Sequence, residues 1–158
     1  PRMMLKPMLI NIYQRPQMIA MVFEWNRLLR QIDLRQGAAK LKNPMEDSVT
    51  GGGGVGTMMG TSTGQWEGKV LVTHVTNFSS EKLLDEYIPN SDQLQLTEHI
   101  RLKGRDTLED RITIQDSQYF TRPWDVVLTY KRQSDRLFPF PEDICLDRKN
   151  AGELPLPR

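Results

Sequence analysis

The stretch that decides the fold is QLQLTEHIRLKGRDTLEDRITIQ, residues 93–115. Apolar side chains take alternate positions on both sides of its centre, at Leu94, Leu96, Ile100 and Leu102 and then at Leu108, Ile112 and Ile114. Such alternation is typical of strands with one buried face. Residues 103–106, which include a glycine, separate the two segments, so we expect an antiparallel hairpin.

Working outward, we expect further strands in the segments 9–14, 18–25, 28–34, 70–76 and 126–131. No pattern of alternating strands and helices is visible. We therefore predict an all-β domain, either an antiparallel meander that closes or nearly closes into a calycin-like barrel, or a curved sandwich. One short helix is expected near 80–87, where Ser79 and Ser80 offer N-cap hydroxyls and Pro89 follows.

The length of 158 residues favours a single domain spanning 1–158. Residues 36–64 are rich in glycine and poor in large aliphatic side chains, which predicts a long loop. Residues 139–158 form a proline-rich tail that we expect to be extended. The loop and the two ends of the chain are candidate contact regions for protein partners.

The charge is nearly balanced, with 21 Lys and Arg against 20 Asp and Glu. Nucleic-acid binders normally show a basic excess or stripe, so we expect no nucleic-acid partner. No window approaches the ~20 apolar residues of a membrane helix, and we expect no transmembrane segment. The single cysteine, Cys145, excludes an internal disulfide framework and a cysteine-rich zinc site.

Glu98 and Asp110 stand at alternate positions that apolar residues otherwise occupy in the central hairpin. Both carboxylates should point to the buried face, where each needs a partner, water or a cavity. Such a pair suits general acid and base catalysis. The alternative is structural: Arg30, also on an apolar strand face, pairs with one of them, or a bulge turns Asp110 outward.

His74 shares a strand face with two valines, so it is a third candidate catalytic residue if it points inward. His99 falls on the polar face of its strand. Two histidines on opposite faces do not form a zinc site. Gly51, Gly53 and Gly56 match a dinucleotide fingerprint in spacing, but we reject it because the segment lacks the preceding strand of a βαβ unit and the following helix. The sequence contains no phosphate-binding P-loop and no zinc-protease motif. We therefore expect no metal and no cofactor.

Aromatic side chains are the candidates for binding an apolar ligand. Inside a small barrel, such residues line a cavity or simply fill the core. The candidate ligand-binding residues are Phe23, Trp25, Trp66 and Trp124.

Several segments together carry a resemblance to a known family. They are PRMM at 1–4, GQWEGKVLV at 64–72, LTEHI at 96–100 with DTLE at 106–109, and YFTRPW at 119–124. In this order they resemble an uncharacterised family of small, usually secreted bacterial proteins with the pattern G-x-W-E-G-D-T-L-V-V-D, V-E-R-F, D-T-L and Y-T-[KR]-P-W. The resemblance implies a mostly β, extracytoplasmic (periplasmic or secreted) protein whose signal sequence has been removed. It implies no activity.

Two positions depart from the family pattern. His74 stands where the family has an aspartate, so any role of that acid does not carry over. Family members often have a cysteine just before the PRMM segment, which this chain lacks. The resemblance leaves open whether Cys145 pairs with such a cysteine or is a free thiol.

Three functions follow from these features. The first is an exported, non-catalytic binding or accessory protein that holds a small apolar ligand. The second is a structural subunit of a larger extracytoplasmic assembly. The third is an enzyme (an isomerase, lyase or hydrolase) that uses Glu98 and Asp110, with or without His74.

Overall fold

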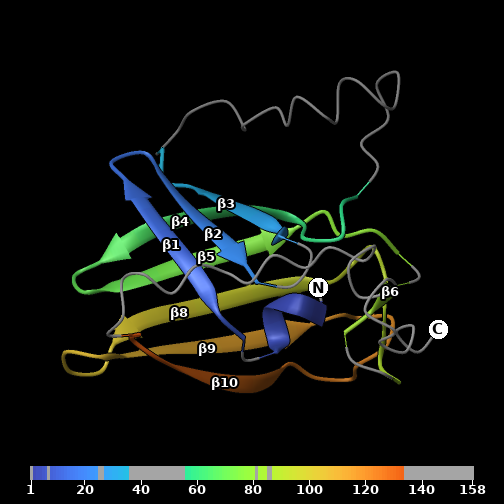
Figure 1. Ribbon diagram of the computed structural model, residues 1–158. Coiled ribbons are helices and arrows are strands. Elements are labelled where there is room, and N and C mark those ends of the chain that lie inside the picture. The colour runs from blue at the N-terminus through green and yellow to red at the C-terminus, as the bar shows by residue number, and fades with distance from the viewer. Residues whose placement is uncertain are drawn as a thin grey trace, which may run out of the picture.

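The computed structural model describes residues 2–6, 8–24, 27–35, 56–80, 82–84 and 87–133, without the side chains of Met3 and Lys82. Its main feature is an eight-stranded sheet that curls into a half-barrel (Figure 1). The strands, in their order across the sheet, are β1 (Ile10–Arg15), β2 (Met18–Phe23), β3 (Leu29–Asp33), β4 (Thr61–Glu67), β5 (Val70–Thr76), β8 (Gln95–Leu102), β9 (Thr107–Gln115) and β10 (Trp124–Lys131). The predicted all-β class is confirmed.

The sheet is an antiparallel meander except at one place. Strands β3 and β4 run parallel and pair only through Ile32 with Ser62 and Asp33 with Thr63. A parallel pair needs a long crossover connection, which the chain between Asp33 and Thr61 provides. Residues 61–64, which we expected in the loop, belong to β4, whereas residues 36–55 lie outside the described part of the chain.

The predicted helix near 80–87 is wrong. Lys82–Leu83 form strand β6, which pairs with β7, Pro89–Asn90, in a small second sheet. Leu84 is fully buried, and its backbone N–H donates to the carbonyl of Ile88. Burial of this apolar side chain and the local strand pairing override the capping signal of the two serines. Among the described residues, the one helical element is the short 3-10 turn η1, Arg2–Leu5.

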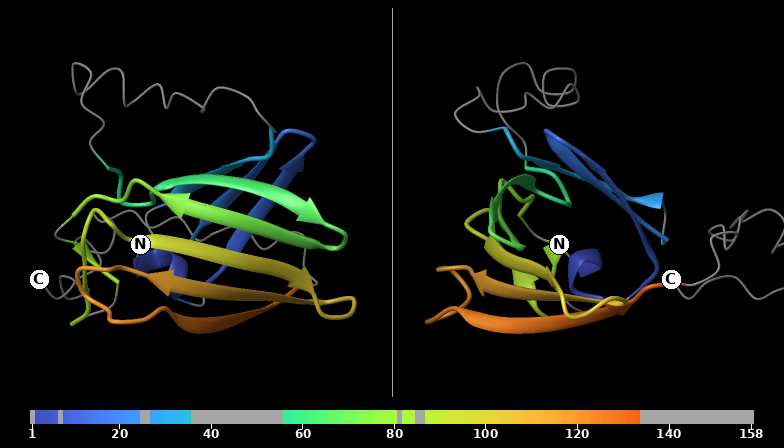
Figure 2. Two further views of the ribbon diagram at one scale, coloured as in Figure 1. Left: turned by 180° about the vertical axis from the view of Figure 1, so that it is seen from behind. Right: turned by 90° about the vertical axis from the view of Figure 1, so that its left-hand side faces the viewer.

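The core lies on the concave side of the curled sheet. Figure 2 shows the strands curling around η1, whose Met4 is almost completely buried. The inner faces of the eight strands supply most of the remaining core, including Ile19, Phe23, Ile32, Val75, Leu96, Ile112 and Ile114. Among the described residues, no helix is long and apolar enough to span a membrane.

A buried carboxylate fixes the chain where the β7–β8 connection meets the end of β9. Asp116 accepts hydrogen bonds from the backbone N–H and the hydroxyl of Ser91, at 2.7 and 2.8 Å, and from the N–H of Gln118 at 3.1 Å. These bonds satisfy polar groups that the core would otherwise leave without partners. They hold the two connections in one place relative to β8 and β9.

Candidate functional site

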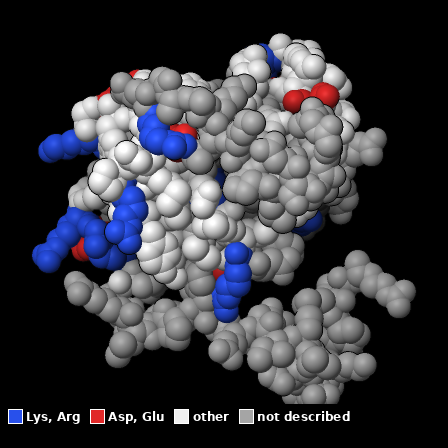
Figure 3. Space-filling view, turned by 90° about the horizontal axis from the view of Figure 1, so that it is seen from above, with Lys and Arg blue, Asp and Glu red and all other residues white. Residues whose placement is uncertain are grey.

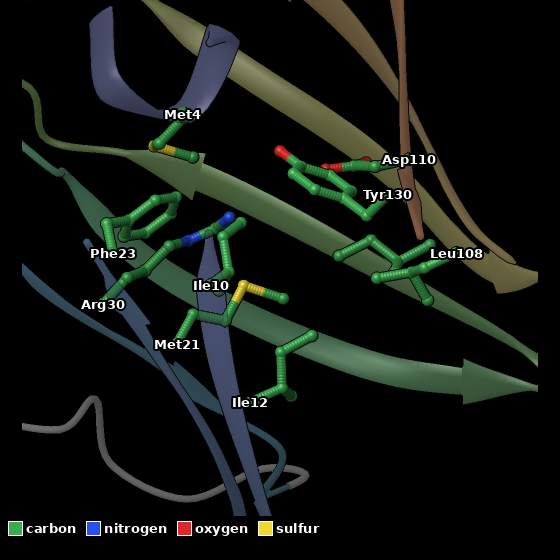
Figure 4. A pocket seen from close by; sticks show the side chains of 10 residues that line it. Met4, Ile10, Ile12, Met21, Phe23, Arg30, Leu108, Asp110 and Tyr130 are labelled. Atoms are coloured by element: carbon green, nitrogen blue, oxygen red, sulfur yellow. The ribbon is translucent and has the colours of Figure 1, made fainter. Parts of the chain in front are cut away.

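A small cavity opens on the inner face, between the β1–β2 hairpin on one side and β8, β9 and β10 on the other (Figure 4). Its volume is about 10 Å³, roughly the space of one water molecule. Most of the wall is apolar. The cavity is lined by Met4, Ile10, Ile12, Met21, Phe23, Arg30, Ile100, Leu108, Asp110 and Tyr130.

Beside the cavity, Arg30 on β3 forms a buried ion pair with Glu98 on β8. Arg30 Nη1 donates to Glu98 Oε1 at 2.8 Å, and Nη2 donates to Oε2. Thr73 on β5 donates its hydroxyl to Oε2, and Arg30 Nε donates to Ser62 Oγ on β4 at 3.0 Å. Arg30 is 3% exposed and Glu98 0%, so this network crosses the interior and is closed to solvent.

Asp110 on β9 is different, because its carboxyl is not fully paired. Only 7% of the residue is exposed, and among the described residues its Oδ1 has no hydrogen-bond partner. Burial, and to a lesser extent the nearby charge of Glu98, raise the pKa of Asp110 to about 8, although Arg30 opposes the shift. Asp110 is therefore mostly protonated at pH 7 and is both a donor and an acceptor.

Tyr130 on β10 is the second polar group of the cavity. Its hydroxyl projects into the space beside the carboxyl of Asp110 (Figure 4). Burial raises the pKa of Tyr130 well above its usual value, and the charges of Asp110 and Glu98 act in the same direction. The phenol therefore keeps its proton at neutral pH and can donate it in a hydrogen bond.

The structure brings together two of the three predicted catalytic residues. Glu98 and Asp110 both point inward, as the alternation predicts, and Asp110 is not turned out by a bulge. The structural alternative for Glu98, an ion pair with Arg30, is confirmed. Glu98 is therefore occupied, and Asp110 is the acid that faces open space.

The inward orientation considered for His74 is wrong. His74 is exposed on the convex face of β5, where its Nδ1 lies 3.3 Å from Thr97 Oγ1. Leu71, Thr73 and Val75 occupy the inward positions of that strand instead. His99 is exposed on the same convex face, so the two histidines share a face rather than lying on opposite ones. Among the described residues, no group of three or more His, Cys, Asp or Glu side chains is placed to hold a metal ion.

The four predicted ligand-binding aromatic residues divide into separate places. Phe23 lines the cavity. Trp66 is 48% exposed, and Trp124 packs edge-on against Phe120 with ring centroids 5.6 Å apart, so neither lines it. Trp25, like Cys145 and the tail 139–158, lies outside the described residues.

The sequence reasoning missed Tyr130, Met4 and Met21. Tyr130 carries a usable signal, since it lies two positions from Leu128 on the alternating inner face of β10. Met4 and Met21 carry none, because their place in the wall depends on how η1 and the hairpin fold over distant strands.

Basic side chains gather at one end of the molecule, the end at which the β4–β5 and β8–β9 turns lie (Figure 3). Arg101 and Lys103 there both form ion pairs with Glu109. Arg101 and Glu109 lie on the convex face of the sheet, so this basic end is not part of the cavity.

The fold and the cavity together define the class: an all-β half-barrel with a small, largely apolar interior site. No family model, curated protein or solved structure matches the chain.

Proposed function

We propose that this chain is an exported, non-catalytic binding protein that holds a small, mostly apolar molecule in the cavity. The observation that carries the proposal is the carboxyl of Asp110, which is buried, faces a mostly apolar space and has an oxygen with no hydrogen-bond partner among the described residues. A buried polar group of this kind is costly unless something pairs with it. A ligand with an apolar body and one polar group meets both requirements of the site.

The cavity must widen to admit such a ligand, because it now has room for about one water molecule. The parts that would have to move are the adaptable ones. Met4 and Met21 are unbranched side chains that repack at low cost. The β1–β2–β3 unit pairs with β4 through only two residue pairs, and β1 is an edge strand.

The same geometry weighs against the third hypothesis, an enzyme that uses Glu98 and Asp110. A pair of carboxylates used as acid and base needs both groups free to exchange protons with a substrate. Both oxygens of Glu98 accept hydrogen bonds from Arg30, and one also accepts from Thr73. Asp110 alone remains available, which suits recognition of a ligand better than a two-carboxylate mechanism.

The test is a titration of the full chain with cyclohexanol, an apolar ring that bears one polar group, followed by ¹H–¹⁵N NMR spectroscopy. We expect saturable shifts in β1, β2, β9 and β10. Leu108→Trp should abolish them by filling the cavity, whereas Val127→Trp, on the convex face of β10, should leave them unchanged. The absence of saturable shifts in the folded wild-type chain contradicts the proposal. Denaturing mass spectrometry of freshly purified protein provides a second test, in which a co-purified small molecule is the expected finding.

A further inference from the structure

We propose that Asp110 and Tyr130 together hold a single acceptor oxygen, so that the ligand is a compact apolar molecule bearing a carbonyl group. This inference rests on the proposed binding function and specifies the chemistry of its ligand. It concerns the polar end of the cavity, which the apolar wall alone does not explain.

The two side chains come from neighbouring strands and share the inner face. Asp110 lies opposite Leu128, and Tyr130 lies opposite Leu108, so the two polar residues are diagonal neighbours across the β9–β10 pair. Such positions are about 7–8 Å apart between backbones, within reach of long side chains. Figure 4 shows the tyrosine hydroxyl and the aspartate carboxyl projecting into the same part of the cavity.

Both groups present hydrogen-bond donors to that space. Among the described residues, the charged or titratable side chains that face Asp110 are Arg30 from β3, Glu98 from β8 and Tyr130 from β10. Arg30 is occupied by Glu98 and Ser62, so it leaves the carboxyl of Asp110 in its neutral form beside an apolar wall. A neutral carboxyl group in an apolar site donates a hydrogen bond to an oxygen, and the phenol hydroxyl does the same.

Two donors that converge on one point select for an acceptor with two lone pairs. A carbonyl oxygen accepts both bonds, whereas a hydrocarbon leaves both donors unpaired. A carboxylate ligand is disfavoured, because Glu98 lies next to Asp110 and the guanidinium of Arg30 is already used. The remaining wall, including Ile10, Met21 and Leu108, fits the apolar body of the molecule.

The experiment compares cyclohexanone with methylenecyclohexane, which has a CH₂ group in place of the carbonyl oxygen. Both are titrated into the full chain at pH 6 and followed by NMR. We expect cyclohexanone to bind about tenfold more tightly, the effect of two neutral hydrogen bonds. Tyr130→Phe should reduce this preference, measured as the dissociation constant of methylenecyclohexane divided by that of cyclohexanone. Asp110→Asn, which keeps an N–H donor, should preserve it.

A pH series separates this role of Asp110 from a merely structural one. Between pH 6 and pH 9.5 the preference for cyclohexanone should fall in the wild-type chain, because Asp110 loses its proton, and should persist in Asp110→Asn. Equal affinities for the two probes at pH 6 overturn the inference and leave the binding function intact. Binding of neither probe to the folded chain, with the cavity holding water only, overturns both.

Discussion

At the scale of single residues, the two acidic side chains on the inner faces of β8 and β9 have opposite roles. Glu98 is a structural ion: it is fully buried and bonded to Arg30 and Thr73. Asp110 lies on the neighbouring strand β9, two positions from Ile112, the residue that pairs with Glu98. Among the described residues, no cation pairs with Asp110. The difference arises because β3 delivers its one inward arginine to β8 and not to β9.

Removing Arg30 alone should strongly destabilise the fold. Arg30→Met leaves a buried carboxylate uncompensated, and we expect the free energy of unfolding to fall by about 3–5 kcal/mol. The double variant Arg30→Met/Glu98→Met, which removes both charges, should recover much of that loss. Urea denaturation followed by circular dichroism provides the measurement. A double variant less stable than Arg30→Met would contradict the closed-pair interpretation.

Asp110 should make stability fall as the pH rises. Its pKa is about 8 in the folded chain, against 3.8 for the free group, so the folded state binds the extra proton between these values. The stabilisation is complete below about pH 4 and is lost as the pH approaches 8, at a slope of up to about 1.4 kcal/mol per pH unit. Asp110→Asn should flatten this slope over the same range, as measured by urea midpoints. An identical pH profile for the two proteins would contradict the shifted pKa.

At the scale of elements, the strand pair with the fewest paired residues in the eight-stranded sheet is the parallel pair β3 and β4. Gly64 on β4 lies against β3, and a Cβ atom at this position would approach Ile32 Cγ2 to 2.9 Å. A side chain there must push the two strands apart or displace the isoleucine, which lies in the core.

Gly64→Ala should therefore cost about 1–3 kcal/mol of stability, the usual price of overpacking. Val127→Ala on the exposed face of β10 is the matched control and should change stability by less than about 0.5 kcal/mol. Thermal unfolding of the two variants gives the comparison. A Gly64→Ala variant as stable as the control would show that β3 yields easily where it contacts β4.

A second prediction at this scale concerns the carboxylate that joins two connections. Asp116→Ala removes three hydrogen bonds and leaves the buried N–H and hydroxyl of Ser91 without their partner. We expect a loss of about 2–3 kcal/mol in urea denaturation. Asp116→Asn, which can still accept through its amide oxygen, should lose less. Equal losses in the two variants would argue against the hydrogen bonds as the cause.

At the scale of the whole molecule, the sheet consists of two parts of unequal support. Strands β5, β8 and β9 each have a neighbour on both sides, and their inner faces supply much of the buried core. Strand β1 has a neighbour on one side only, and five of its six residues are exposed. The β1–β2 hairpin also forms one wall of the cavity, so the less supported part is the one that ligand entry would move.

Hydrogen exchange should reveal this division. Local opening follows the number of buried contacts and paired neighbours, so the amides of β1 should exchange about tenfold or more faster than those of β8 and β9. Mass spectrometry of exchanged peptides measures both regions in one experiment. Uniform protection across the sheet would contradict a movable hairpin.

The period-two pattern predicted the central hairpin, because each strand there has one apolar and one polar face. It also placed Glu98 and Asp110 inside. It failed at 80–87, where two serines resemble a helix cap but Leu84 is buried against the sheet. It could not place His74, because Val72 and Val75 are both buried although they lie on opposite faces of β5. The cavity itself depends on how η1 and the first hairpin meet β9 and β10, and no local pattern records that.

The long connection between the parallel strands β3 and β4 delays the contacts that β1 to β3 make with the rest of the sheet during synthesis. Strands β1 to β3 are synthesised before β4 to β10, and Arg30 can pair with Glu98 only after the 67 intervening residues have been added. At roughly 5–20 residues per second, the nascent chain must carry the unpaired arginine and the apolar face of β2 for several seconds. During this interval the β1–β2 hairpin is therefore exposed to mispairing with other polypeptides.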